Sequence, residues 1–159
     1  MKIKETYKTK EKIMNNSLTE EQVKVLNMSQ SVINEVRKVI IGKDEIIIKV
    51  LLSILAGGHI LIEDIPGVGK TTLAVALSKA LSLDYKRLQF TPDVLPTDVT
   101  GFTILNKETH KFEYKQGAAL TNLFLADEIN RTSSKTQSAL LEVMEEGKVT
   151  VDGITHKMP

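Results

Sequence analysis

The sequence has no cysteine among its 159 residues, so it can form neither a disulfide nor a thiolate metal site. It also has no long apolar run. The longest, residues 46–55, is broken by Lys49 and Ser53 and falls well short of the roughly 20 residues that a membrane-spanning helix needs. The basic, hydrophilic N-terminus lacks the apolar segment of a signal peptide. These absences predict a cytoplasmic protein without a membrane span.

A charge imbalance is absent as well. Lys plus Arg number 21 and Asp plus Glu number 20, a formal net charge of +1. This balance gives no reason to expect a protein that coats nucleic acid or a membrane surface. A chain of this length can bury one core, so we expect one domain or most of one. Residues 1–16 place lysines among polar residues and are expected to form a flexible basic tail.

Hydrophobic periodicity predicts four helices. The first is expected to begin at Ser17 or Thr19 and to end at about Gly42, with Ile33, Val36 and Ile40 on one buried face; its capping signal includes Glu20 and Glu21. The others are expected over residues 44–56, 71–82 and 134–146, the last capped by Thr132 or Ser133. The helix at residues 44–56 is apolar on most sides and is expected to be buried.

Strands are expected between these helices. The segments "HILIED" (residues 59–64) and "NLFLADE" (residues 122–128) are typical of buried parallel strands, and "YKRLQF" (residues 85–90) alternates like a strand. Hairpins are expected at residues 101–115 and 148–158, the second on its Asp152-Gly153 turn. Prolines predict a loop at residues 92–101. The alternation of strands and helices predicts a three-layer α/β fold with a mainly parallel sheet and two β-hairpin inserts, and ligands bind such sheets at the carboxyl ends of the strands.

A glycine-rich segment follows the first predicted strand and opens a helix. Such a loop holds phosphates with consecutive backbone N–H groups, and the helix N-terminus adds partial positive charge. Lys70 would contact the β- and γ-phosphates, and the Thr71 hydroxyl would ligate Mg²⁺. Asp64 stands where the general pattern has its first glycine, and the alternative is a strand-to-helix turn that binds nothing. The residues predicted to bind the phosphates are Pro66, Gly67, Val68, Gly69, Lys70, Thr71 and Thr72.

Two acids end the predicted strand at residues 122–128. Asp127 is suited to hold Mg²⁺ through its water shell, and Glu128 is suited to activate the attacking water. The alternative is a solvated strand end. A small-molecule kinase needs no residue that activates water, and the Asn-Lys-x-Asp motif of a GTP switch is absent from the sequence. Lys70, Asp127 and Glu128 are therefore the predicted catalytic residues of an enzyme that hydrolyses ATP.

The sequence resembles the AAA+ ATPases of the MoxR type from about Val39 to Pro159. The segments that carry this resemblance are "GGHILIEDIPGVGKTTLAVALSKAL", "QFTPDVLPTDVTG" and "LADEINRTSSKTQSALLEVMEEGKVTVDGITHKMP". In MoxR-type sequences an acid-x-Pro-Gly-x-Gly-Lys-Thr loop is usual, which accounts for Asp64. The resemblance also implies that Ile41 and Gly42 lie against the adenine, although Lys43 stands where the family often has Gln.

The resemblance implies a ring-forming, chaperone-like ATPase. Such proteins form homo-hexamers when full length, and they remodel or mature clients or partners with a von Willebrand factor A-type domain. Both hairpins resemble elements that face the central pore. Residues 17–159 resemble the N-terminal portion of the nucleotide-binding domain, without its sensor-1 strand, arginine finger and lid, so the fold is expected to be incomplete at its C-terminus and the fragment alone inactive. Arg131 is expected either to contact a neighbouring subunit's nucleotide or to pair locally.

Three classes of function stay open. The first is an ATP-driven remodeller of proteins. The second is a module that binds nucleotide without turnover. The third is an AAA+ motor or activator acting on nucleic acid, which the balanced charge and the absence of a basic stripe in either hairpin count against.

Overall fold

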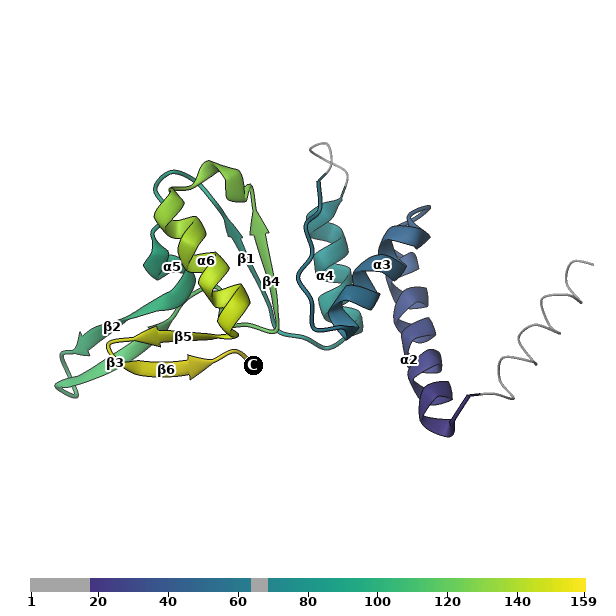
Figure 1. Ribbon diagram of the computed structural model, residues 1–159, viewed down its shortest axis with the longest axis horizontal. Coiled ribbons are helices and arrows are strands. Elements are labelled where there is room, and N and C mark those ends of the chain that lie inside the picture. Colours follow the sequence, from purple (N-terminus) through teal and green to yellow (C-terminus); the bar gives the residue numbers. More distant parts are fainter. Residues whose placement is uncertain (1–17, 64–68) are drawn as a thin grey trace, which may run out of the picture. The chain divides into compact units, whose positions relative to one another are not determined.

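The computed structural model describes residues 18–63 and 69–159 of the chain, so the predicted tail lies outside the described residues. The chain divides into two compact units, Met1–Ile60 and Leu61–Pro159, and each is described by itself. The first contains helices α2 and α3, and the second contains α4 and all the strands (Figure 1).

Helix α2 spans Glu20–Arg37 and begins at one of the two predicted positions. The Thr19 hydroxyl accepts a hydrogen bond from the Gln22 N–H at 3.3 Å, and the Gln22 side chain accepts one from the Thr19 N–H at 2.9 Å, which together form a capping box. The predicted face is confirmed for Ile33 and Val36, which are buried on the helix, whereas Ile40 is buried but lies beyond the end of the helix. The helix ends at Arg37, earlier than the predicted Gly42.

Helix α3 spans Asp44–Leu55, close to its predicted bounds. Arg37 joins the two helices, because its Nε and Nη2 donate to the two carboxylate oxygens of Asp44 at 2.9 Å each. The expectation of burial on most sides is wrong. Ile47, Val50 and Leu51 are buried, but one neighbouring helix covers only one face of α3, and Leu52 and Leu55 are 60% and 55% exposed.

The predicted strand at residues 59–64 is absent from its described part. Residues 59–63 form no regular structure, Leu61 is 77% exposed, and Asp64 lies outside the described residues. A strand needs a neighbour for its backbone N–H and C=O groups. The ladders of the described residues join β1 to β4, β2 to β3 and β5 to β6, and none includes this segment.

A parallel pair of strands lies in the second unit. Strand β1 (Tyr85–Gln89) pairs with β4 (Leu123–Asp127), and Gln89 lies opposite Asp127 at their carboxyl ends. Both strands were predicted from sequence. The residues of β4 are half-buried, so the expectation of a fully buried strand is wrong; among the described strands β4 has a ladder on one edge only. Helix α4 (Lys70–Ala80), predicted at residues 71–82, contacts β4.

Both predicted hairpins are confirmed. Strand β2 (Gly101–Asn106) pairs with β3 (Lys111–Gln116), and β5 (Lys148–Val151) pairs with β6 (Ile154–Lys157). In the second turn Asp152 and Gly153 have φ values of 50° and 79°. Two consecutive positive φ values define a type I′ turn, which matches the twist of a hairpin.

The core of the second unit lies between β1, the short helix α5 (Pro96–Thr100) and helix α6 (Ser134–Glu146). The predicted loop over residues 92–101 is therefore wrong in part, because Pro96 takes the first helical position, where a missing N–H costs nothing. Ser133 caps α6, as one of the two predicted residues. The buried core residues are Phe90, Val99, Ala119, Leu140, Val143 and Val149.

Candidate functional site

The predicted phosphate loop runs into the first turn of α4. Gly69 precedes the helix with a φ of 88°, a left-handed conformation that suits glycine, and Lys70 is the first helical residue. Lys70 and Thr71 are half-buried and Thr72 is exposed. The first backbone N–H groups of a helix lack intrahelical partners, so this end of α4 can receive an anion. The predicted residues Pro66, Gly67 and Val68 lie outside the described residues.

The acid pair lies where the parallel strands end. Asp127 is the last residue of β4, and the N–H of Phe90, which follows β1, donates to the Asp127 carbonyl at 2.8 Å. Because α4 contacts β4, the helix that begins with Lys70 and the strand that ends with Asp127 are neighbours in one unit. The fold therefore places both predicted motifs on adjoining elements.

Asp127 forms an ion pair with Arg87, a residue that was not among the predicted site residues. Arg87, on β1, donates from Nη2 at 2.7 Å and from Nε at 3.3 Å, and both bonds end on the same oxygen, Oδ2. The side chains are 41% exposed for Arg87 and 27% exposed for Asp127. The carboxylate of Asp127 is thus held in place by a charged, two-pronged contact.

Glu128 leaves the strand with an unusual backbone. Its φ of 56° and ψ of 41° are left-handed, and it precedes the short helix η1 (Ile129–Arg131). Such strain in a residue other than glycine gathers at functional sites. Its Oε2 accepts hydrogen bonds from Arg131 Nη1 at 2.7 Å and from Gln89 Nε2 at 3.4 Å. Arg131 therefore pairs locally, which was one of its two expected roles.

These two contacts stabilise the charged form of Glu128. The hydrogen bond from Arg131 and then that from Gln89 lower the pKa of Glu128 below its ordinary value, against a smaller opposing effect of burial. Glu128 is consequently ionised at neutral pH. An ionised carboxylate can accept a hydrogen bond from water and orient it, and the lowered pKa makes Glu128 a weaker proton acceptor than an unpaired glutamate.

The side chains predicted to bind a metal suit Mg²⁺ better than they suit a metal whose ligands all come from the protein. Within residues 18–63 and 69–159 no group of three or more His, Asp or Glu side chains could enclose a metal ion. Mg²⁺ usually keeps several waters and takes one or two carboxylates together with substrate phosphates. Asp127 and the Thr71 hydroxyl fit that pattern.

Two residues of this site were missed by sequence reasoning, Arg87 and Gln89. A signal was present, because the alternation of "YKRLQF" places both on one face of the strand. Only the parallel register of β1 with β4 shows that this face carries Asp127. The predicted adenine contacts, Ile41 and Gly42, belong to the first unit, where Ile41 is 86% exposed.

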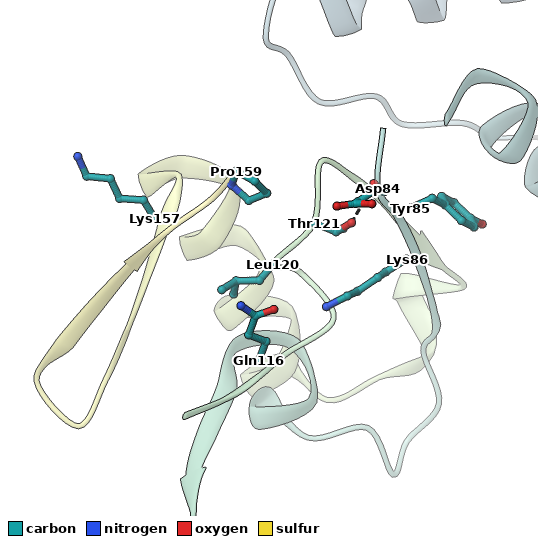
Figure 2. Close-up of a pocket in the computed structure, with 8 residues that line it drawn as sticks. All are labelled: Asp84, Tyr85, Lys86, Gln116, Leu120, Thr121, Lys157 and Pro159. Carbon is teal, nitrogen blue, oxygen red and sulfur yellow. Dashed lines mark hydrogen bonds between the residues drawn. The ribbon is translucent and has the colours of Figure 1, made fainter. Parts of the chain in front are cut away.

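A separate hollow lies near the start of β1, at the opposite end of this strand from the acid pair (Figure 2). Two contacts close part of its wall: the Thr121 hydroxyl donates to the Asp84 carbonyl at 2.9 Å, and Lys86 Nζ donates to the Gly117 carbonyl at 3.2 Å. None of the predicted site residues lines it. Its lining consists of Asp84, Tyr85, Lys86, Gln116, Leu120, Thr121, Lys157 and Pro159.

Comparison with known proteins identifies the family. Residues 59–159 match AAA_3, described as the ATPase family associated with various cellular activities (AAA). The chain belongs to this MoxR-type ATPase family. Full-length members are ATPases, and the described residues contain a part of the AAA fold that includes the parallel pair of β1 with β4 and the two antiparallel hairpins.

Three relatives illustrate the similarity. The chain is 56% identical over 126 residues to the uncharacterized protein YeaC of Bacillus subtilis, covering 79% of this chain and 39% of YeaC. It is 42% identical over 125 residues to the chaperone MoxR1 of Mycobacterium tuberculosis, covering 79% and 33%. A solved structure from Cytophaga hutchinsonii matches with a TM-score of 0.75 and 45% identity, covering 84% of this chain and 40% of that one. The chain thus spans between one third and two fifths of the length of these relatives.

The described helices differ from helices that span a membrane. In residues 18–63 and 69–159, none combines the length and the apolar character that crossing a membrane requires.

Proposed function

We propose that this chain forms the nucleotide-binding part of a MoxR-type AAA ATPase that uses ATP hydrolysis to remodel or mature partner proteins. The observation that supports it best is the placement of Asp127 and Glu128 at the carboxyl end of β4, beside the helix that begins with Lys70 and Thr71. This arrangement joins an anion-binding helix end to a metal-binding acid and a base.

Each residue has a proposed part in hydrolysis. Lys70 and the backbone N–H groups from Pro66 to Thr72 bind the phosphates of ATP, and Thr71 and Asp127 hold Mg²⁺. Bound Mg²⁺ neutralises charge that develops on the phosphate oxygens. Glu128 orients a water molecule and accepts its proton as the water attacks the terminal phosphorus, the bond from this phosphorus to the bridging oxygen breaks, and ADP leaves. Ile41 and Gly42 are proposed to contact the adenine.

The complete fold is proposed to be a three-layer P-loop domain with a mainly parallel sheet, to which residues 17–159 contribute the N-terminal portion. In it, residues 59–64 become a strand once a further strand offers them a ladder. The partial coverage of YeaC and MoxR1 supports this proposal, since most of their length lies outside the match.

The proposed assembly is a cytoplasmic homo-hexamer acting on a protein client or on a partner with a von Willebrand factor A-type domain. MoxR1 is named as a chaperone, which supports a protein client. The β2–β3 and β5–β6 hairpins, which contact each other through β2 and β5, offer a surface for such a client. Nucleic acid is not expected, because the chain is electrically balanced.

Calorimetric titration of the full-length protein with Mg²⁺ and ATP tests the binding site. Lys70→Ala should abolish measurable binding, because it removes the positive side chain of the phosphate loop. Lys79→Ala is the matched control, since Lys79 is an exposed lysine in the last turn of the same helix and should leave the affinity unchanged. An affinity for Lys70→Ala within a few fold of the unmutated value would contradict the assignment.

Glu128→Gln separates binding from hydrolysis in the same titration. The substitution keeps the shape of the side chain and removes only its ability to accept a proton, so Mg²⁺ and ATP should still bind with unchanged affinity. A full-length protein that keeps most of its hydrolysis after this substitution would show that Glu128 is not the base. A full-length protein that binds ATP and never hydrolyses it would favour the binding-only alternative.

A further inference from the structure

The contact between Arg87 and Asp127 is diagonal across the parallel pair. In register, Arg87 lies opposite Leu125, and Gln89 lies opposite Asp127. Residues two apart on a strand share a face, so the Arg87 side chain reaches one pleat forward to the carboxylate at the end of the neighbouring strand. A long side chain is needed to span that offset, and arginine supplies both length and a fixed fork of donors.

The two hydrogen bonds of Arg87 converge on a single oxygen of Asp127. Nη2 lies 2.7 Å and Nε 3.3 Å from Oδ2. An arginine remains charged at every pH at which a protein is folded, so this cation cannot be removed by deprotonation. Asp127 therefore carries a permanent counter-ion on the carboxylate that is proposed to face the metal.

We propose that Arg87 is a positioning residue that sets the affinity of the nucleotide site for Mg²⁺, because its guanidinium competes with the metal for the Asp127 carboxylate. The inference rests on the proposed function, since it assigns Asp127 to the metal. Without metal, Arg87 neutralises Asp127 and fixes its orientation. When Mg²⁺ binds with the nucleotide, it has to compete with the Arg87 guanidinium for the Asp127 carboxylate. It is also repelled by the positive charge of that guanidinium.

The other arginine of the site acts on the other acid. Arg131 donates to Oε2 of Glu128 at 2.7 Å, and Gln89, which also contacts Glu128, is neutral. Arg87 comes from β1 and Arg131 from η1, so the two cations are placed by different elements. Arg87 Nη2 also donates to Gln89 Oε1 at 3.4 Å, a long contact to a neutral side chain. Removing Arg87 should therefore change the metal dependence of the site and leave the 2.7 Å ion pair between Arg131 and Glu128 in place.

The expected size of the effect follows from the exposure of the pair. Because Arg87 is 41% exposed, solvent screens its charge considerably. Partly exposed ion pairs contribute modestly, and losing this competitor should lower the Mg²⁺ concentration at half-saturation about three- to fivefold.

The test is a magnesium titration of a fluorescent ATP analogue bound to the protein, starting from a chelated, metal-free solution. Arg87→Met and Arg87→Gln remove the charge and keep much of the length, and either variant should lower the half-saturating Mg²⁺ concentration. Arg87→Lys keeps a charge but loses the length and the fork of donors, so its half-saturating concentration should lie between those of the unmutated protein and of Arg87→Met. Lys86→Met is the matched control, because it removes a cation from the adjacent position, whose side chain donates to Gly117 on the opposite face of β1.

A double substitution shows whether Arg87 acts through Asp127. Asp127→Asn should raise the half-saturating Mg²⁺ concentration, and adding Arg87→Met to it should change nothing further. Direct counting of bound Mn²⁺ by electron paramagnetic resonance gives the same comparison without nucleotide fluorescence.

An unchanged or raised half-saturation in both charge-removing variants would overturn the inference while leaving the nucleotide site intact. An equal effect of Arg87→Met in the Asp127→Asn background would overturn it as well. These titrations use the full-length protein, and if its unmutated form binds the analogue neither with nor without Mg²⁺, the proposed function fails, and this inference fails with it.

Discussion

Glu128 combines a left-handed backbone with an ion pair that stabilises its charged form. The hydrogen bond from Arg131 is the largest cause of its lowered pKa. Arg131→Ala should therefore raise the pKa of Glu128 toward the ordinary value of about 4.3. Carbon-detected NMR of the Glu128 carboxyl group against pH measures this directly, and Lys135→Ala, which removes an exposed cation nearby in sequence, is the control.

The direction of this effect on stability also follows. A carboxyl group whose pKa is lower in the folded state stabilises the fold above its unfolded pKa, and this contribution disappears as the pH falls through the folded pKa. The contribution of Glu128 is thus present at neutral pH and lost only in acid. An unchanged pKa of Glu128 in Arg131→Ala would show that the ion pair does not lower this pKa.

Gly117 makes a close backbone approach that a side chain would block. A Cβ at this position would lie 2.2 Å from the Val99 carbonyl oxygen and 2.4 Å from the Gly101 nitrogen. The residues that follow it, Ala118 and Ala119, donate to the carbonyls of Asp98 and Val99 at 2.8 and 3.1 Å, which ties the end of β3 to α5.

Gly117→Ala should consequently lower the free energy of unfolding by roughly 1–3 kcal/mol, the usual cost of forcing atoms into a packed site. Gly58→Ala is the control, because the nearest atom to its Cβ is 3.4 Å away and its φ is not in the left-handed region. Denaturant unfolding of the two variants gives the comparison. Equal stabilities would show that the backbone around Gly117 moves aside at no cost.

At the scale of elements, an aromatic stack joins the two hairpins. The rings of Tyr114 on β3 and His156 on β6 are stacked, with centroids 3.8 Å apart and planes 15° apart. The Tyr114 hydroxyl donates to the Thr100 carbonyl at the end of α5. Burial raises the pKa of Tyr114, so the phenol stays protonated and remains a donor.

Tyr114→Leu should release the β5–β6 hairpin, because it removes both the stack and the hydroxyl. Hydrogen exchange of the amides in residues 148–157 should accelerate. The free energy of unfolding should fall by about 1–3 kcal/mol for the loss of the two contacts together. Tyr114→Phe keeps the ring and should lose only the smaller, hydroxyl part. Phe112→Leu is the control on the same strand, since Phe112 is 77% exposed. Unchanged exchange in Tyr114→Leu would show that the hairpins are held by their other contacts.

The elements that sequence predicts well are those whose signals are local. The Asp152-Gly153 turn, the Ser133 cap and the alternation around Arg87 each carry their information within a few residues. The acid pair was placed correctly at a strand end for the same reason. The ion pairs of these acids were harder to predict from sequence. The pair of Arg87 with Asp127 depends on the register between β1 and β4, and the pair of Arg131 with Glu128 depends on the left-handed turn at Glu128.

The incorrect predictions concern which neighbours a segment packs against, and this cannot be read from its own residues. Residues 59–63 have the composition of a buried strand, but a strand also needs a ladder, and Leu61 remains 77% exposed without one. Helix α3 was expected to be buried on most sides, but Leu52 and Leu55 are exposed, and among the described residues of the first unit α3 packs against α2. Pro96 was taken as a loop residue, although proline also suits the first position of a helix.

At the scale of the whole molecule, the described residues contain several parts of the proposed ATPase site but no sheet that joins all of them. Strands β1 and β4 form a two-stranded parallel pair, while residues 59–63, which lead toward the phosphate loop, join no ladder of the described residues. Hydrolysis requires Glu128 within hydrogen-bonding reach of a water aligned on the terminal phosphate. A misplacement of about 1 Å can cost on the order of 100-fold in rate.

We therefore expect residues 1–159 on their own to show no appreciable ATPase activity and no stable ring, although weak nucleotide binding can survive because the phosphate loop is local. Exposed apolar side chains, among them Leu52, Leu55 and Leu61, should also make the isolated chain prone to aggregation. Phosphate release measured beside the mass from size-exclusion chromatography with light scattering checks both expectations. A longer protein that continues beyond Pro159 along the length of MoxR1 is the comparison, and it should gain turnover and assembly together, because a neighbouring subunit's arginine contributes roughly a thousandfold or more in related phosphoryl transfers. A monodisperse hexamer of residues 1–159 with the turnover of the longer protein would show instead that this segment already contains the complete catalytic machinery.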